Sequence, residues 1–178
     1  MTDSKKLLGD ERRSFILSLL QDNARPFTGS ELARRTNVSR QIIVGDITLL
    51  KAKNEPIIAT SQGYLYLQQS KPVLYEKIVA CNHGPERTEE ELNLLVDNGV
   101  TVKDVKIEHP VYGDLTASIL VSNRNEVKKF MKKIKNTNAT YLSQLTGGIH
   151  LHTISAASME TLEEAEDALR EAKFLMED

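Results

Sequence analysis

Four side chains in the second half of the chain carry the donor atoms that transition metals prefer. His150 and His152 are two residues apart in a β-prone segment, so both imidazoles point to the same face of a strand. His83 follows another predicted strand, and Glu91 lies one to two helical turns further along the chain. If the two strands approach each other, these residues supply three imidazoles and one carboxylate. Such a set suits Zn, Ni or Fe(II) better than Mg or Ca.

Simpler explanations of the same residues stay open at this point. A His-x-His pair on a half-exposed strand is often incidental, and Glu91 also fits the N3 position of a capping box that begins at Thr88. Cys81, the single cysteine, is expected to be a small buried apolar residue rather than a ligand. His109 precedes Pro110 at a predicted strand end, which favours a solvated turn. The residues alone therefore indicate a candidate metal site.

A second group of residues, in the first half of the chain, has the pattern of a DNA-reading helix. Arg40 and Gln41 lie at its exposed N-terminal end, where they suit bidentate pairing with guanine and adenine. Val44 suits contact with a thymine methyl, and Gly45 permits a close approach. Neighbouring basic residues are expected to contact phosphates, and an ordinary solvated basic face is the simpler alternative. The predicted DNA-binding residues are Arg34, Arg35, Ser39, Arg40, Gln41, Val44, Gly45 and Thr48.

Local signals around these residues predict three helices. Asp10 is expected to cap a first helix that ends before Pro26, and Thr28 with Glu31 forms a capping-box pattern for a second helix. Ser39 is expected to cap the third helix. The buried stripe of that third helix is expected to consist of Ile43, Ile47 and Leu50.

Two β-prone runs, 57–60 and 64–67, follow the helices, and Gly63 supplies the positive φ that a turn between them often needs. Three helices followed by a hairpin is the order of elements in a winged helix-turn-helix. The polar stretch 68–72 is expected to be a domain boundary. The sequence thus predicts a winged helix-turn-helix DNA-binding domain over residues 1–70 and a second domain, which contains the candidate metal site, over residues 71–178.

The second half alternates strands and helices. Strands are expected at residues 75–81, 100–107, 115–121 and 149–155. Helices are expected to begin at Thr88, at Asn123 or Asn125, and at Ser158, the last of them running through Leu175. This β-α-β-β-α-β-α order predicts an α+β fold in which the second domain is a split-βαβ-like sandwich, with helices on one face of an antiparallel sheet.

Charge and composition support two domains with different partners. Residues 1–70 carry ten Lys or Arg and seven Asp or Glu, whereas the remaining residues carry 13 basic and 18 acidic groups. A basic first half and an acidic second half fit two domains with different partners, and an ordinary solvated surface is the alternative. One cysteine permits no intrachain disulfide, and the chain has no apolar signal segment and no run of about 20 apolar residues. A cytoplasmic protein without a membrane partner is expected.

The helix-turn-helix segment is similar to known DNA-binding proteins. The residues Thr28-Gly-Ser-Glu-Leu-Ala-Arg-Arg-Thr-Asn-Val-Ser-Arg-Gln resemble the helix-turn-helix of many bacterial repressors and the regulatory cap of biotin protein ligases. The ligase alternative fails, because nothing after residue 70 resembles the Gly-Arg-Gly-Arg loop that holds the adenylate in those enzymes.

Two further segments, His83-Gly-Pro-Glu-Arg…Glu91 and Gly147-Gly-Ile-His-Leu-His-Thr153, resemble the three-histidine ligand domain of the niacin-responsive repressors. These are bacterial regulators of NAD biosynthesis and niacin uptake, and the resemblance covers nearly the whole chain. It implies an operator-binding repressor with nicotinic acid as co-repressor and one divalent transition metal. Residues 71–178 would then be a three-histidine small-molecule and metal-binding domain. By that resemblance the metal ligands are His83, Glu91, His150 and His152. The resemblance identifies no residue that contacts the pyridine ring of nicotinic acid.

Two other classes of function stay open. A metal held by three histidines and a carboxylate can activate water, as in a metal-dependent enzyme acting on a pyridine compound. Four protein ligands, however, leave less open coordination than the three of catalytic zinc, and a fused DNA-binding domain favours sensing. We therefore expect no enzyme. The other class is a ligand-independent dimeric DNA-binding protein. A homodimer is expected in either DNA-binding case, because symmetric pairing lets two winged domains read a palindrome.

Overall fold

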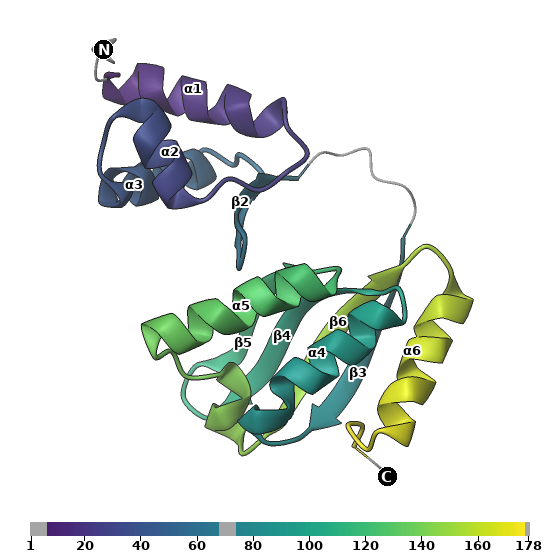
Figure 1. The fold of residues 1–178 in the computed structure, drawn as a ribbon. Coiled ribbons are helices and arrows are strands. Elements are labelled where there is room, and N and C mark those ends of the chain that lie inside the picture. Colours follow the sequence, from purple (N-terminus) through teal and green to yellow (C-terminus); the bar gives the residue numbers. More distant parts are fainter. Residues whose placement is uncertain (1–6, 68–73, 177–178) are drawn as a thin grey trace. The chain divides into compact units, whose positions relative to one another are not determined.

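The computed structural model describes residues 7–67 and 74–176. The chain divides into two compact units, Met1–Ser70 and Lys71–Asp178 (Figure 1). Each unit has a hydrophobic core of its own, so the two are described separately. The polar stretch 68–72, where the sequence predicts a domain boundary, lies outside the described residues.

Three helices form most of the first unit. They are α1 (Gly9–Gln21), α2 (Gly29–Thr36) and α3 (Arg40–Ala52). The Thr28 side chain accepts a hydrogen bond from the backbone N–H of Glu31, and Ser39 caps α3 in the same way, so both predicted N-caps are confirmed. The predicted cap at Asp10 is wrong. This residue lies inside the first turn of α1, where its carboxylate pairs with Arg13 instead of the free N–H groups.

An apolar stripe and a buried ion pair hold α3 in place. The predicted stripe of Ile43, Ile47 and Leu50 is buried in the core of the first unit. On the same helix, Asp46 is only 3% exposed and accepts hydrogen bonds from Arg12 of α1 at 2.5 and 3.2 Å. The sequence reasoning missed this ion pair. A rotation of α3 would separate Asp46 from Arg12 and leave an uncompensated buried charge. The pair therefore fixes which side of α3 faces outward.

A β-hairpin completes the winged helix-turn-helix. Its strands are β1 (Ile57–Thr60) and β2 (Gly63–Tyr66), which pair antiparallel. Gly63 has a φ of 134°, and a Cβ there would lie 2.5 Å from the carbonyl oxygen of Phe27. The close approach arises because Phe27 and Tyr64 exchange backbone hydrogen bonds of 2.9 and 2.8 Å. Glycine is therefore required at this turn, as the sequence predicts.

The second unit alternates strands and helices in the predicted order. Its elements are β3 (Tyr75–Asn82), a 3₁₀ turn η1 (Pro85–Arg87), α4 (Thr88–Asp97), β4 (Thr101–His109), β5 (Gly113–Val121), α5 (Arg124–Thr137), a second 3₁₀ segment η2 (Leu142–Thr146), β6 (Ile149–Ala156) and α6 (Met159–Glu171). Asn123 and Ser158 cap α5 and α6 by accepting hydrogen bonds from the N–H groups of Glu126 and Thr161. Of the two caps considered for α5, Asn123 is the one used.

The four strands form one antiparallel sheet in the order β3-β6-β4-β5. Because β6 lies between β3 and β4, the segment β3-α4-β4 is a split βαβ unit. Helices α4, α5 and α6 cover the same face of the sheet, and the core lies between the two layers (Figure 1). The predicted α+β fold, a winged helix-turn-helix followed by a split-βαβ-like sandwich, is confirmed.

The last helix ends earlier than the sequence predicts. It stops at Glu171 instead of continuing to Leu175, because Lys173 adopts a left-handed φ of 57° and the chain turns back. Phe174 is then fully buried, and Leu175 forms a bridge with Cys81 of β3. The spacing of apolar residues does not distinguish a further helical turn from such a return.

Candidate metal centre, ligand pocket and DNA-binding face

Three histidines and one glutamate from different elements meet in the second unit. His150 and His152 are on β6, His83 follows the last residue of β3, and Glu91 lies in the first turn of α4. Strands β3 and β6 are neighbours, with Cys81 directly opposite His150. The four side chains come together because β6 occupies the gap between β3 and β4. All four residues are buried, with at most 7% of their surface exposed.

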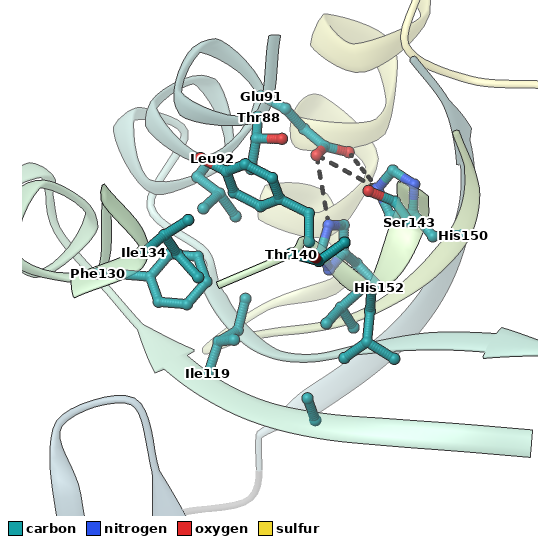
Figure 2. A pocket seen from close by; sticks show the side chains of 14 residues that line it. Thr88, Glu91, Leu92, Ile119, Phe130, Ile134, Thr140, Ser143, His150 and His152 are labelled. Carbon is teal, nitrogen blue, oxygen red and sulfur yellow. Dashed lines mark hydrogen bonds and ion pairs between the residues drawn. The ribbon is translucent and has the colours of Figure 1, made fainter. Parts of the chain in front are cut away.

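The carboxylate of Glu91 is at the centre of this cluster, and Figure 2 shows it facing the two histidines of β6. Its Oε2 atom lies 2.7 Å from Nε2 of His83 and 3.4 Å from Nε2 of His152. Nε2 of His150 lies 3.4 Å from both carboxylate oxygens and is within hydrogen-bonding distance of Oε2. The other oxygen, Oε1, has no hydrogen-bond partner among the described residues. Three imidazole nitrogens thus point at one carboxylate.

The second nitrogen of each ring decides what those Nε2 atoms can do. The Nδ1 atoms of His83, His150 and His152 lie 2.8, 2.8 and 2.6 Å from the backbone carbonyl oxygens of Gly84, Gly148 and Asp104. A carbonyl oxygen only accepts, so each Nδ1 donates a proton and each neutral ring presents a lone pair at Nε2. These lone pairs face carboxylate oxygens that also only accept. The arrangement therefore requires positive charge between them, either a bound cation or extra protons on the rings.

The electrostatics of the cluster agree with this requirement. Burial raises the pKa of Glu91, but the three imidazoles outweigh burial and hold that pKa well below its ordinary value. Burial lowers the pKa of His83 and of His152, but the Glu91 carboxylate outweighs burial and raises both pKa values. Backbone carbonyls that orient histidines through Nδ1 are also the usual outer partners of metal-binding imidazoles. The donor set and its surroundings fit a divalent transition metal.

Cys81 is closer to this cluster than sequence reasoning suggested. It is fully buried, as expected, and burial raises the pKa of its thiol, to which the negative charge of Glu91 adds. The donor atoms of Cys81, Glu91 and His150 all lie within 4.8 Å of one another. Only the pairing of β3 with β6 brings the thiol there, opposite His150.

An apolar pocket opens beside the cluster (Figure 2). Its volume is about 170 Å³, and Glu91, His150 and His152 form one end of it. The rest of the lining comes from α4, β4, β5, α5 and the segment that leads into η2, and is mostly hydrophobic. These residues include Leu92, Val105, Ala117, Ile119, Phe130, Ile134 and Leu142. His83 is not among the lining residues, so the pocket reaches the cluster from the side of the β6 histidines.

Two hydroxyl-bearing residues, Thr88 and Ser143, lie near the polar end of the pocket in Figure 2. Both are buried, and the Thr88 hydroxyl has no hydrogen-bond partner among the described residues. The capping-box explanation of Glu91 is therefore wrong, because Thr88 is the first residue of α4 and caps nothing. His109 stays at the end of β4, where its Nδ1 accepts hydrogen bonds from the N–H groups of Val111 and Tyr112.

The residues predicted to contact DNA lie on α2 and α3 and at the cap between them. Seven of the eight are exposed, and Val44 is half-buried. A Cβ added at Gly45 would meet no atom within 4 Å, so the surface of α3 is open there. Arg35 is partly engaged, since it pairs with Glu31 at 3.2 Å. Ile42 and Leu49 are also 37% and 50% exposed on α3, which the sequence reasoning did not anticipate.

Comparison with known proteins identifies the family. Residues 76–178 match the 3H domain, and residues 12–65 match an HTH domain. The chain is 60% identical over its full length, and over the full length of the relative, to "Transcription repressor NadR" of Bacillus subtilis (strain 168). It is 39% identical to "Probable transcription repressor NiaR" of Thermotoga maritima, over 97% of this chain and 98% of that protein. The chain belongs to the NadR/NiaR family of transcription repressors.

Membership of this family confirms the resemblance to the niacin-responsive repressors and the DNA-binding helix-turn-helix. The relatives are named as repressors, in agreement with the expectation that the chain is not an enzyme. None of the helices in the described part of this repressor is long and apolar enough to cross a membrane.

The pocket of this repressor is what sequence reasoning missed. Phe130 and Ile134 are spaced like ordinary core residues of α5, and nothing in the segment from Thr140 to Ser143 predicts contact with a ligand. Two apolar residues four positions apart give the same sequence pattern whether the helix packs on a sheet or lines a cavity. No local signal in the sequence separates the two cases.

Proposed function

We propose that this repressor controls genes of NAD biosynthesis and niacin uptake, and that nicotinic acid is its co-repressor. The observation that carries the proposal is the apolar pocket, which ends at a buried cluster of three imidazoles and a carboxylate. A small aromatic ring with a charged or coordinating group matches both ends of such a pocket. Gene regulation follows from the family and from the helix-turn-helix.

The metal in this proposal is a divalent transition ion, Zn, Ni or Fe(II), with His83, Glu91, His150 and His152 as its ligands. Imidazole nitrogen and carboxylate oxygen are donors that these ions accept. The orphaned Oε1 of Glu91 and the inward lone pairs support it, since both are satisfied by a cation. Such an ion would supply positive charge and a coordination position for a pyridine nitrogen or a carboxylate.

The size of the pocket supports a single ring as the ligand. A cavity of about 150 Å³ lined by apolar side chains holds one benzene molecule, and this pocket measures about 170 Å³. Nicotinic acid is one six-membered aromatic ring with a carboxylate. A nucleotide of the same base has to extend outside the cavity. The free acid therefore fits better than NAD or its mononucleotide precursor.

Repression further requires a homodimer that reads operator DNA, which we place in the cytoplasm. One winged unit reads a short half-site, and a two-fold symmetric pair reads a palindrome. Arg34, Arg35, Ser39, Arg40, Gln41, Val44, Gly45 and Thr48 are the residues proposed to contact DNA, and their exposure supports this role. Nicotinic acid acts as co-repressor only if it binds the DNA-competent arrangement more tightly than the incompetent one.

The decisive experiment titrates the DNA upstream of the chain's own gene with the repressor, with and without nicotinic acid. A coupling of about 1–3 kcal/mol would tighten binding roughly 5- to 150-fold. The variant His150→Ala/His152→Ala should lose tightly bound metal and nicotinic acid binding while keeping its ligand-free DNA affinity. His109→Ala is the matched control, because this histidine lies at the β4–β5 turn.

Two outcomes would contradict the proposal. If a folded double variant loses its metal but binds nicotinic acid like the wild type, the ligand does not occupy the metal-linked pocket. If nicotinamide tightens operator binding as much as nicotinic acid does, the carboxylate is not what the site recognises. Circular dichroism establishes that the variant is folded.

A further inference from the structure

Helix α5 presents an unusual outer surface. Its inner side is anchored in the core by Val127 and Met131, which are buried. Its outer side carries a row of lysines over a helix of 14 residues, roughly 20 Å long. The helix contains six basic residues and one acidic residue, which are Arg124, Lys128, Lys129, Lys132, Lys133, Lys135 and Glu126.

The net charge of α5 is opposite in sign to that of the rest of the second unit. Outside α5, residues 71–178 carry seven basic and 17 acidic residues, a net charge of −10, whereas α5 carries +5. Soluble surfaces usually intersperse the two signs. A concentrated positive surface on an otherwise acidic unit marks a binding face for a negatively charged partner.

Four of the five lysines on α5 are also unusual in forming no ion pair within the described residues. Outside α5, most basic residues in the described part of this unit contact a carboxylate, as do Lys77, Arg87, Lys103, Lys106 and Arg170. Arg124, at the start of α5, also pairs, with Asp97. In residues 74–176 no ion pair is formed by Lys128, Lys129, Lys132 or Lys135, and all four are exposed. Their charges are available to a partner.

The buried inner side of α5 limits which kinds of partner can bind its lysines. A basic amphipathic helix can lie in a membrane surface only if its apolar side is free, and here that side is committed to the core. A second copy of the chain could offer the acidic helix α6. Glu166 and Asp167 of α6 are already paired with Lys77 and Arg170. Other carboxylates of that helix, Glu160, Glu163 and Glu164, are exposed, so contact between copies is the alternative that sedimentation tests. A phosphate backbone suits a row of exposed lysines on a chain that already contains an HTH domain.

We propose that the lysines of α5 form a second DNA contact, which binds the phosphate backbone of operator DNA. This inference rests on the proposed function, because it assumes a DNA-binding repressor. Double-stranded DNA carries one negative charge per roughly 1.7 Å of axis, so a helix of this length faces several phosphates. Such contacts add affinity and salt dependence without reading bases.

The same helix lines the ligand pocket. Phe130 and Ile134 of α5 face the cavity, while Lys128, Lys129 and Lys132 face outward. A ligand that packs against the inner side of α5 therefore acts on the element that holds the DNA-contacting lysines. The helix connects pocket and DNA contact without an intermediate element.

The test measures DNA affinity of the full chain at several salt concentrations between roughly 50 and 200 mM, with nicotinic acid present. The probes are the chain's upstream DNA and a duplex of random sequence. The test variant is Lys128→Gln/Lys132→Gln, in which glutamine preserves helix propensity. The control, Arg170→Gln/Lys173→Gln, removes the same charge from two exposed positions, one in the last turn of α6 and one just beyond that helix.

We expect the slope of log K against log salt to become shallower by about 0.9 for each lost phosphate contact, or about 1.8 per protomer in the test variant. The loss should be similar on both probes, and the control should match the wild type. A test variant with the wild-type slope overturns the inference while leaving the proposed function intact. If that variant instead shifts the monomer–dimer equilibrium in sedimentation at an unchanged slope, α5 is a contact between copies and the DNA assignment is wrong. A wild-type chain that binds neither probe refutes both proposals.

Discussion

Replacing Gly45 by alanine should make the protein more stable and a poorer DNA binder. Gly45 lies inside α3, is exposed, and has no atom within 4 Å of the position a Cβ would take. A glycine in a helix interior costs about 0.5–1 kcal/mol relative to alanine, and here nothing clashes with the added methyl group. The free energy of unfolding should therefore rise by about that amount.

Operator binding should change in the opposite direction. Gly45 is one turn from Gln41 on the outward side of α3, where the proposed close approach to DNA occurs. A methyl group inserted into a packed interface costs about 1–3 kcal/mol when neither side can yield. This corresponds to a roughly 5- to 150-fold weaker operator affinity. A glycine needed only for the fold would not give a variant that is more stable and yet binds the operator more weakly.

The measurement combines urea denaturation with an anisotropy titration of labelled operator. Ser14→Ala is the matched control, because Ser14 is an exposed residue of α1 and alanine raises its helix propensity too. That variant should gain stability and bind DNA normally. If Gly45→Ala binds DNA as well as the wild type does, α3 does not approach DNA at this position and the assignment of its outer face is refuted.

Three further predictions concern the other proposed contacts. Arg40→Ala should cost about 1–3 kcal/mol on the specific site and much less on random DNA in the same titration; equal losses would make Arg40 a phosphate contact. Ala117→Leu should fill the pocket and abolish nicotinic acid binding in calorimetry, with metal content and ligand-free DNA affinity unchanged; retained binding would place the ligand elsewhere. A fragment of residues 72–178, which contains a separate core, should still sediment as a dimer at micromolar concentration, and a monomer would place the dimer contact in the first unit.

Local chemistry made part of this structure predictable from sequence. The caps at Thr28, Ser39, Asn123 and Ser158 were readable because a cap depends on a side chain and a backbone N–H three residues away. The same-face placement of His150 and His152 followed from the two-residue period of a strand. Prediction failed at the end of α6, where the distant contact between Leu175 and Cys81 decides the path of the chain. It also failed at Asp10, where a local ion pair with Arg13 competes with capping.

The sequence by itself determined the types of donor atoms, the order of the elements and the family of this repressor. The tertiary structure decided that His83 and Glu91 meet the β6 histidines, because strand order is set by packing of the whole sheet rather than by any one segment. It also decided that Phe130 and Ile134 line a cavity and that Cys81 lies opposite His150. Cavities and buried charge clusters arise from pairs of surfaces, and one segment of sequence describes only one surface of each pair.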